Sequence, residues 1–219
     1  MISEGLLHFV EFELQIIALI VFVGLYSLRI SHIVKLPLPK ESAPAAGKAG
    51  RGVFVSFSSI INPKSMDSTT KHFWRWIEFF IYHLGALAAI LATFTLPFAP
   101  GMMTYTVRIV FSVFIGLAIP VGIIKLIRRF SNPHLRFISV PDDYFSLIAV
   151  ELYFVFAALC LVYFTDFWRF IYFLVTALFL IYVPFSKISH YVYWFFARVY
   201  LGIRFGRHGV LPRKRLQNG

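Results

Sequence analysis

The stretch WRWIEFFIYHLGALAAILATFTLP, from Trp74 to Pro97, decides the fold of this chain. A hydrocarbon core of ~30 Å needs ~20 residues of helix, so this run is long enough to cross a bilayer. One histidine, His83, lies well inside it, and an imidazole at that depth is costly unless it has a partner. The small residues beside it, such as Gly85, either leave room for a flat macrocycle bound through His83 or let a neighbouring helix approach closely.

The composition places the whole chain in the membrane class. Of its 219 residues, 59% are hydrophobic and only 14% are charged, which lies outside the range of ordinary soluble domains. The net charge of +11 does not predict a nucleic-acid partner, because the basic residues stand in short segments between apolar runs. The single cysteine, Cys160, excludes an internal disulfide and a cysteine-ligated cluster.

Five apolar runs predict an all-α fold, a polytopic bundle of five transmembrane helices that forms a single membrane domain over residues 1–205. The segment 31–71 contains prolines and glycines and is predicted to be a loop outside the membrane, with an apolar part, Gly52 to Ile61, available for a partner. Residues 206–219 form a basic tail. The spans are expected at about 11–30, 74–97, 105–126, 144–165 and 167–185, with helical continuation of the last to about residue 205.

The cationic residues predict the orientation of these spans. Nineteen of the 21 lysines and arginines fall on one side of a five-span chain, and only Arg108 and Arg169 fall on the other. Because positively charged loops stay on the inner side of the membrane, we expect the N-terminus outside and the C-terminus in the cytoplasm. No lysine or arginine precedes Arg29, so the first run lacks the basic region of a cleavable signal and is expected to remain in the mature protein.

Three stretches together resemble one protein family. They are YHLG at Tyr82–Gly85, IRRFSNPHLRFISVPDD at Ile127–Asp143, and PFSKISH at Pro184–His190. They are similar to the histidine helix, the basic cytoplasmic loop and the last-helix signature of the cytochrome b (gamma, NarI-type) subunits of respiratory nitrate reductases and their relatives. The likeness covers about Glu13 to Arg207. The small, strongly apolar form looks most like the membrane cytochrome b-type subunit of transmembrane redox complexes of sulfate reducers, such as the high-molecular-weight cytochrome c complex.

The resemblance implies a haem site. In that family five helices hold two b haems, each between a histidine of the second span and a histidine of the last. Carried over to this chain, the pair nearer the cytoplasm falls on His83 and His190. The other pair falls near Thr93 and on Tyr172, and neither is a histidine. The resemblance therefore implies one haem b on the cytoplasmic side, with the second site absent.

A second ligand pairing stays open. At ~1.5 Å per residue, His190 lies ~36 Å along its helix from the outer surface and His83 only ~21 Å, so a kink or tilt must bring them to one height. His72 lies ~37 Å from the outer end of its helix and is the alternative partner for His190.

Four charged residues are further site candidates. Lys187 and Arg75 are candidate partners for haem propionates, or they are positive-inside surface residues. Glu78 and Glu151 lie within spans, where either can accept a proton from a bound quinol. The structural alternative is that each pairs with a basic residue such as Arg128.

Three function classes compete. The leading one is a membrane electron-transfer subunit that connects the quinone pool or other membrane subunits with a cytoplasmic iron-sulfur subunit, with a periplasmic multihaem cytochrome c reached through the complex. The resemblance places such a subunit in the cytoplasmic membrane of a bacterium or archaeon, in an anaerobic respiration such as sulfate reduction. A haem-free membrane anchor is the alternative, and a small transporter is the third, although the sequence has few of the polar midplane residues that a transporter needs. No nucleotide-binding glycine loop, nucleophile elbow or zinc motif occurs, so the chain is not predicted to be a catalyst on its own.

Overall fold

The computed structural model describes residues 2–37, 44–62 and 71–210, and every regular element in these ranges is helical. Five of the described helical runs are long and apolar enough to cross a membrane, which is the pattern of a multi-pass membrane protein. The five-span prediction is confirmed at this level. The runs are Glu4–Lys35, Phe73–Phe98, Tyr105–Ser131, Pro141–Tyr163 and Asp166–Phe185.

The chain divides into two compact units. The larger unit combines Met1–Val34 with Ile77–Ile188, and the smaller unit combines Lys35–Trp76 with Ser189–Gly219. The larger unit therefore holds nearly all of the membrane-spanning runs, and α5 (Phe73–Phe98) begins in the smaller unit and continues in the larger one.

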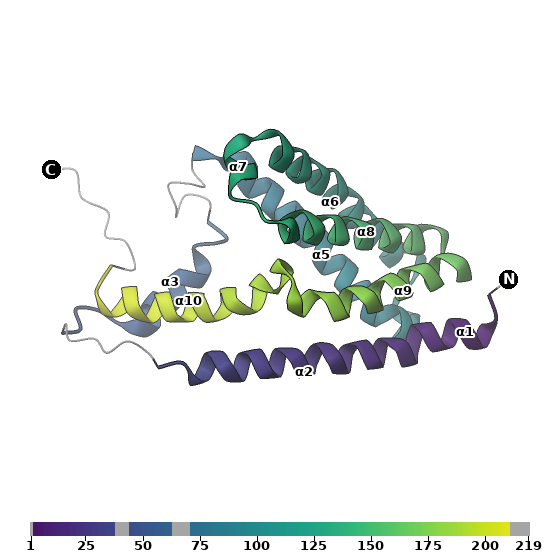
Figure 1. Cartoon of the computed structure of the whole chain (residues 1–219), viewed down its shortest axis with the longest axis horizontal. Coiled ribbons are helices and arrows are strands. Elements are labelled where there is room, and N and C mark those ends of the chain that lie inside the picture. Colours follow the sequence, from purple (N-terminus) through teal and green to yellow (C-terminus); the bar gives the residue numbers. More distant parts are fainter. Residues whose placement is uncertain (1, 38–43, 63–70, 211–219) are drawn as a thin grey trace. The chain divides into compact units, whose positions relative to one another are not determined.

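Short connections join α5 to α6, α6 to α8 and α8 to α9, whereas the segment between α2 and α5 belongs to the smaller unit (Figure 1). The first run is not a regular α-helix throughout, because a π-helical turn, η1, separates α1 from α2. The short helix α7 connects α6 to α8, which pack against each other, and α8 packs in turn on α9. Their bounds are α1 Glu4–His8, η1 Phe9–Glu13, α2 Leu14–Lys35, α6 Tyr105–Ser131, α7 Pro133–Phe137, α8 Pro141–Tyr163 and α9 Asp166–Tyr182.

The core of the larger unit is built from small residues on α5 and aromatic residues on α8 and α9. Ala89 and Ala92 of α5 and Phe154 of α8 are completely buried. A Cβ at Gly85 would collide with the Cβ of Ala118 on α6, so Gly85 is used for close helix approach, one of the two roles expected for it. Large apolar side chains remain exposed on the outside of the spans, as contact with lipid requires.

The helix of the last span does not continue without interruption past Pro184. A 3₁₀ turn, η4 (Val183–Phe185), ends α9, and Ser186 then adopts an extended conformation before a second turn, η5 (Lys187–Ser189). Proline has no N–H to continue the helical hydrogen bonds, and the Ser186 hydroxyl accepts a hydrogen bond from the N–H of Ile188 (3.1 Å). The expected helical continuation is therefore a separate helix, α10 (His190–Arg207).

Two helices, α3 (Ala49–Ser58) and α10, lie side by side in the smaller unit (Figure 1). The segment 31–71 was expected to be a loop, but it contains this helix, and the face of α3 with Gly52 packs on α10 of the same chain. The amides of Ala46 and Gly47 donate hydrogen bonds to the carbonyl of Arg207 (2.7 and 2.8 Å). The segment before α3 thus provides donors for a carbonyl at the C-terminal end of α10, which has no partner within its own helix.

Candidate functional site

His83 is exposed on α5, and its ring is held by its own helix. The Nδ1 atom lies 2.7 Å from the carbonyl oxygen of Phe79, one turn earlier, and the Phe79 ring packs on the imidazole with centroids 4.0 Å apart. A carbonyl can only accept, so Nδ1 carries the proton and the lone pair is on Nε2. A hydrogen bond of this kind orients the imidazoles that ligate metals.

The other two candidate ligands belong to the smaller unit. His190 is the first residue of α10 and is exposed, and His72 is exposed immediately before α5 begins. The carbonyl of His72 accepts a hydrogen bond from the N–H of Arg75 (3.0 Å). His72 and Arg75, a candidate partner for a haem propionate, therefore lie together at the start of α5. His83 lies in the larger unit.

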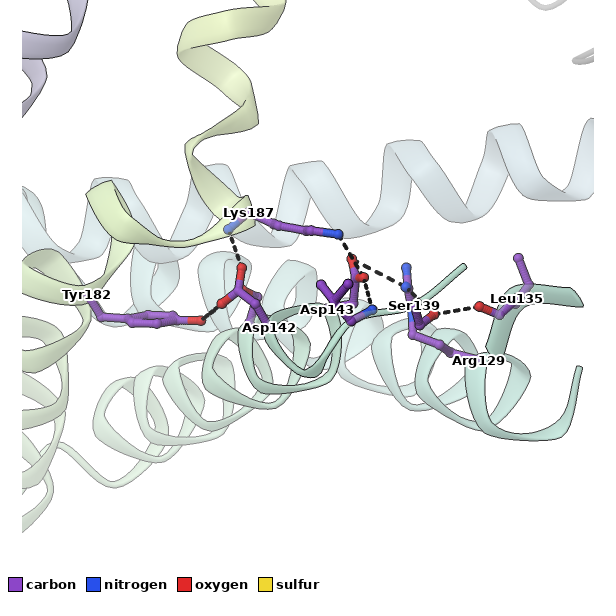
Figure 2. A network of polar contacts seen from close by, with 9 residues as sticks. Arg129, Leu135, Ser139, Asp142, Asp143, Tyr182 and Lys187 are labelled. Carbon is purple, nitrogen blue, oxygen red and sulfur yellow. Dashed lines mark hydrogen bonds and ion pairs between the residues drawn. The ribbon is translucent and has the colours of Figure 1, made fainter. Parts of the chain in front are cut away.

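Lys187 is engaged with two aspartates of α8 (Figure 2). Its Nζ atom pairs with Asp143 Oδ2 at 2.8 Å, and its backbone N–H donates to Asp142 Oδ2 at 2.9 Å. The Tyr182 hydroxyl donates to the other oxygen of Asp142 (2.6 Å), and Arg129 pairs with Asp143 (3.3 Å). Asp142 and Asp143 end the stretch Ile127–Asp143, and Lys187 lies in the stretch Pro184–His190. These two stretches, which both carry the family resemblance, are therefore joined by hydrogen bonds and ion pairs.

Thr93 and Tyr172, the two positions expected to lack haem ligands, contact each other directly. Thr93 Oγ1 lies 2.6 Å from the Tyr172 hydroxyl and 2.8 Å from that of Tyr153, and the Tyr172 hydroxyl donates to the carbonyl of Ala89 (3.0 Å). We call Thr93, Tyr153 and Tyr172 the hydroxyl cluster. All three residues are buried, so the hydroxyl cluster closes this part of the core between α5, α8 and α9.

The two membrane glutamates have different surroundings. Glu78 forms an ion pair with Arg128 of α6, the structural alternative that the sequence left open. Glu151 of α8 has no such pair among the described residues, and both of its oxygens are buried without a hydrogen bond there. The hydroxyl of Tyr82 on α5 faces the carboxylate as a donor, and Lys125 of α6 acts on it electrostatically.

Some of these residues were not anticipated from the sequence. Tyr153 lies in an apolar run of α8 and gave no signal, because its role depends on two hydroxyls from other helices. The role of Asp142 has a signal in the sequence, because the pattern PDD at the start of a helix is typical of an N-terminal turn with acidic residues. Comparison with known proteins found no match: neither a family model, nor a curated protein, nor a solved structure is significantly similar to the chain.

Proposed function

We propose that this chain is a membrane electron-transfer subunit that holds one low-spin haem b between His83 and His190. The observation that carries the proposal is the hydrogen bond from His83 Nδ1 to the carbonyl of Phe79, because it presents Nε2 as a ligand within a membrane span. The pairing with His190 rests on the resemblance of PFSKISH to the family signature. Bound there, a haem supplies a centre that gains and loses one electron.

One haem rather than two is supported by the hydroxyl cluster. The ligands of a second haem would stand near Thr93 and at Tyr172, and these side chains are in hydrogen-bond contact at 2.6 Å. A macrocycle between two such residues has to separate them and to break their bonds with Tyr153 and Ala89. The residues present fit one haem at His83 and do not fit another at Thr93.

The proposal predicts one haem b per purified chain, because two imidazoles occupy both axial positions of one iron and the positions of the second site, near Thr93 and at Tyr172, are not histidines. A pyridine haemochrome assay measures the stoichiometry, and a reduced-minus-oxidised spectrum reports the low-spin, six-coordinate state. Two haems per chain would contradict the single site.

A haem-free anchor is the second candidate function. The observation that favours it is the engagement of Lys187 with Asp142 and Asp143, since a lysine held by carboxylates is a poorer partner for a propionate. Arg75 remains the other candidate for that role. A chain that folds in a haem-producing host and binds no haem would exclude the haem site and favour the anchor function over it.

We further propose that the N-terminus lies outside and that the cytoplasmic side docks an iron-sulfur subunit, with quinone or other membrane subunits completing the route. The support is the charge asymmetry, together with the basic residues of the smaller unit, in whose described part no acidic residue occurs. Basic residues there speed the encounter with an acidic partner more than they add affinity.

The orientation has a direct test. A reporter fused after Gly219 is expected to be active in a cytoplasmic assay, because nineteen of the 21 lysines and arginines lie on that side of a five-span chain. A fusion at the N-terminus serves as the opposite control. A periplasmic signal from the C-terminal fusion would reverse the orientation and move the docking surface to the other face.

A further inference from the structure

The carboxylate of Glu151 is the most unusual polar group in the larger unit. Both oxygens are buried, and neither forms a hydrogen bond of ordinary geometry with a group among residues 2–37, 44–62 and 71–210. The hydroxyl of Tyr82, which is also buried, is the side-chain donor that faces this carboxylate and interacts with it. An ionised carboxylate that is buried beside a single neutral donor, without a paired cation, is strongly unfavourable.

The space for this carboxylate is provided by a glycine. A Cβ placed on Gly122 of α6 would collide with the Glu151 carboxyl group, so the side chain occupies the volume that any other residue at position 122 would fill. Glu151 therefore lies against the backbone of α6, and Tyr82 of α5 interacts with it there. The carboxyl group is enclosed by protein and not directed toward water.

The nearest cation is not paired with Glu151. Lys125, one turn after Gly122 on α6, holds its Nζ atom 3.7 Å from the centre of the Tyr82 ring, a cation–π contact. Among the described ion pairs none joins Lys125 to Glu151. Glu78 and Arg128, which pair with each other, are the other charged groups that act on Lys125.

Two other glutamates of the spans, Glu78 and Glu11, provide a comparison within the same chain. Glu78 is paired with Arg128, and Glu11, which is almost fully buried, is paired with Arg169 at 2.7 Å. A guanidinium compensates each of these charges. Glu151 differs from Glu78 and Glu11 because no guanidinium is paired with it. Its neighbours are the neutral hydroxyl of Tyr82 and the ammonium of Lys125, which lies over the Tyr82 ring.

We propose that Glu151 is a proton-binding site of the membrane domain, which holds a proton while Lys125 lies over the Tyr82 ring. The protonated carboxyl group donates to the Tyr82 hydroxyl that faces it. If the Lys125 ammonium moves from the ring to Glu151, the carboxyl group gives its proton to solvent water and an ion pair takes the place of the proton, so the lysine controls whether the proton is held or released. This inference is independent of haem binding.

Carbodiimide labelling of the purified full chain tests the proposal, because dicyclohexylcarbodiimide enters apolar sites and reacts with protonated carboxyl groups. At about pH 8, where an ordinary glutamate is almost entirely ionised, mass spectrometry is expected to find the adduct on Glu151. Glu78, paired with Arg128, and the exposed Glu4 serve as internal controls and are expected to carry little. Adduct on Glu151 is expected to exceed that on either control by about tenfold or more.

Two variants sharpen the result. Glu151→Gln is expected to remove the adduct, while Glu78→Gln is expected to leave labelling of Glu151 unchanged. Lowering the pH to about 5, near the ordinary glutamate value, is expected to raise the adduct on Glu4 much more than that on Glu151. The proposal is overturned if labelling of Glu151 and Glu4 rises in parallel as the pH falls, or if Glu151 stays unlabelled while Glu4 reacts at low pH.

Discussion

Replacing His83 by alanine is expected to reduce the haem content of the purified chain from one per chain to none. The reason is that the proposed site has two protein ligands to the iron, and the Nδ1 hydrogen bond to Phe79 makes His83 the one whose ligating nitrogen is already defined. His190→Ala is expected to have the same effect, whereas His72→Ala retains the haem unless His72 is the true partner. The pyridine haemochrome assay measures each variant.

Two controls separate loss of a ligand from loss of fold. His134 of α7 lies outside the long apolar runs and is exposed, so His134→Ala is expected to keep one haem per chain. Free imidazole added to His83→Ala is expected to restore the six-coordinate spectrum, because it replaces the missing side chain in a folded protein. Retention of a full haem by His83→Ala would remove His83 from the site.

The five spans could be predicted from the sequence because length and hydropathy determine them. Each expected span lies within a helix of the structure or ends within a few residues of it; the run predicted at 74–97, for example, is α5, Phe73–Phe98. The ends were less accurate. The first helix begins seven residues before the expected residue 11, at Glu4, since its amino-terminal turns carry charged residues that lower the hydropathy without preventing helix formation.

The break at Ser186 and the helix α3 could not be predicted in the same way. Pro184 indicated a kink, but the extended conformation of Ser186 depends on local hydrogen bonds that hydropathy does not report. Helix α3 lies in a segment whose prolines and glycines are typical of loops. It is stabilised by contact with α10, which is distant in the sequence.

The candidate site was predictable only in its residue types. The sequence identified Thr93 and Tyr172 as positions without histidine, but the third member of the hydroxyl cluster, Tyr153, follows from the packing of three helices. Likewise, Glu78 and Glu151 were equivalent in the sequence, since both are glutamates in apolar runs. They differ in the residue of α6 that each one faces. Glu78 faces Arg128 and forms an ion pair with it, whereas Glu151 faces Gly122.

The largest expected effect on folding comes from Gly52 of α3. A Cβ at this position would collide with the backbone of Gly202 and Gly206, and backbone atoms cannot move aside as a flexible side chain can. Gly52→Ala is therefore expected to destabilise the packing of α3 on α10 by about 2–3 kcal/mol. Gly50, two residues earlier on the same helix, has open space around its Cβ position, so Gly50→Ala is expected to stabilise slightly, by about 0.4–1 kcal/mol.

Hydrogen exchange measured by mass spectrometry on the full chain in detergent distinguishes these two variants. If α3 opens as a unit, the amides of α3 in Gly52→Ala are expected to exchange roughly 30- to 150-fold faster than in the unmodified chain, since each ~1.4 kcal/mol is a factor of ten. Peptides from α6 and α8 are expected to be unchanged, because both helices belong to the larger unit. Equal exchange rates of the α3 amides in Gly52→Ala and Gly50→Ala would mean that α3 does not pack on α10 through its glycine face. Two other contacts would then have to hold the two helices together. They are the hydrogen bond from the Arg198 guanidinium to the Ser56 carbonyl (3.2 Å) and the ring contact between Phe57 and Trp194.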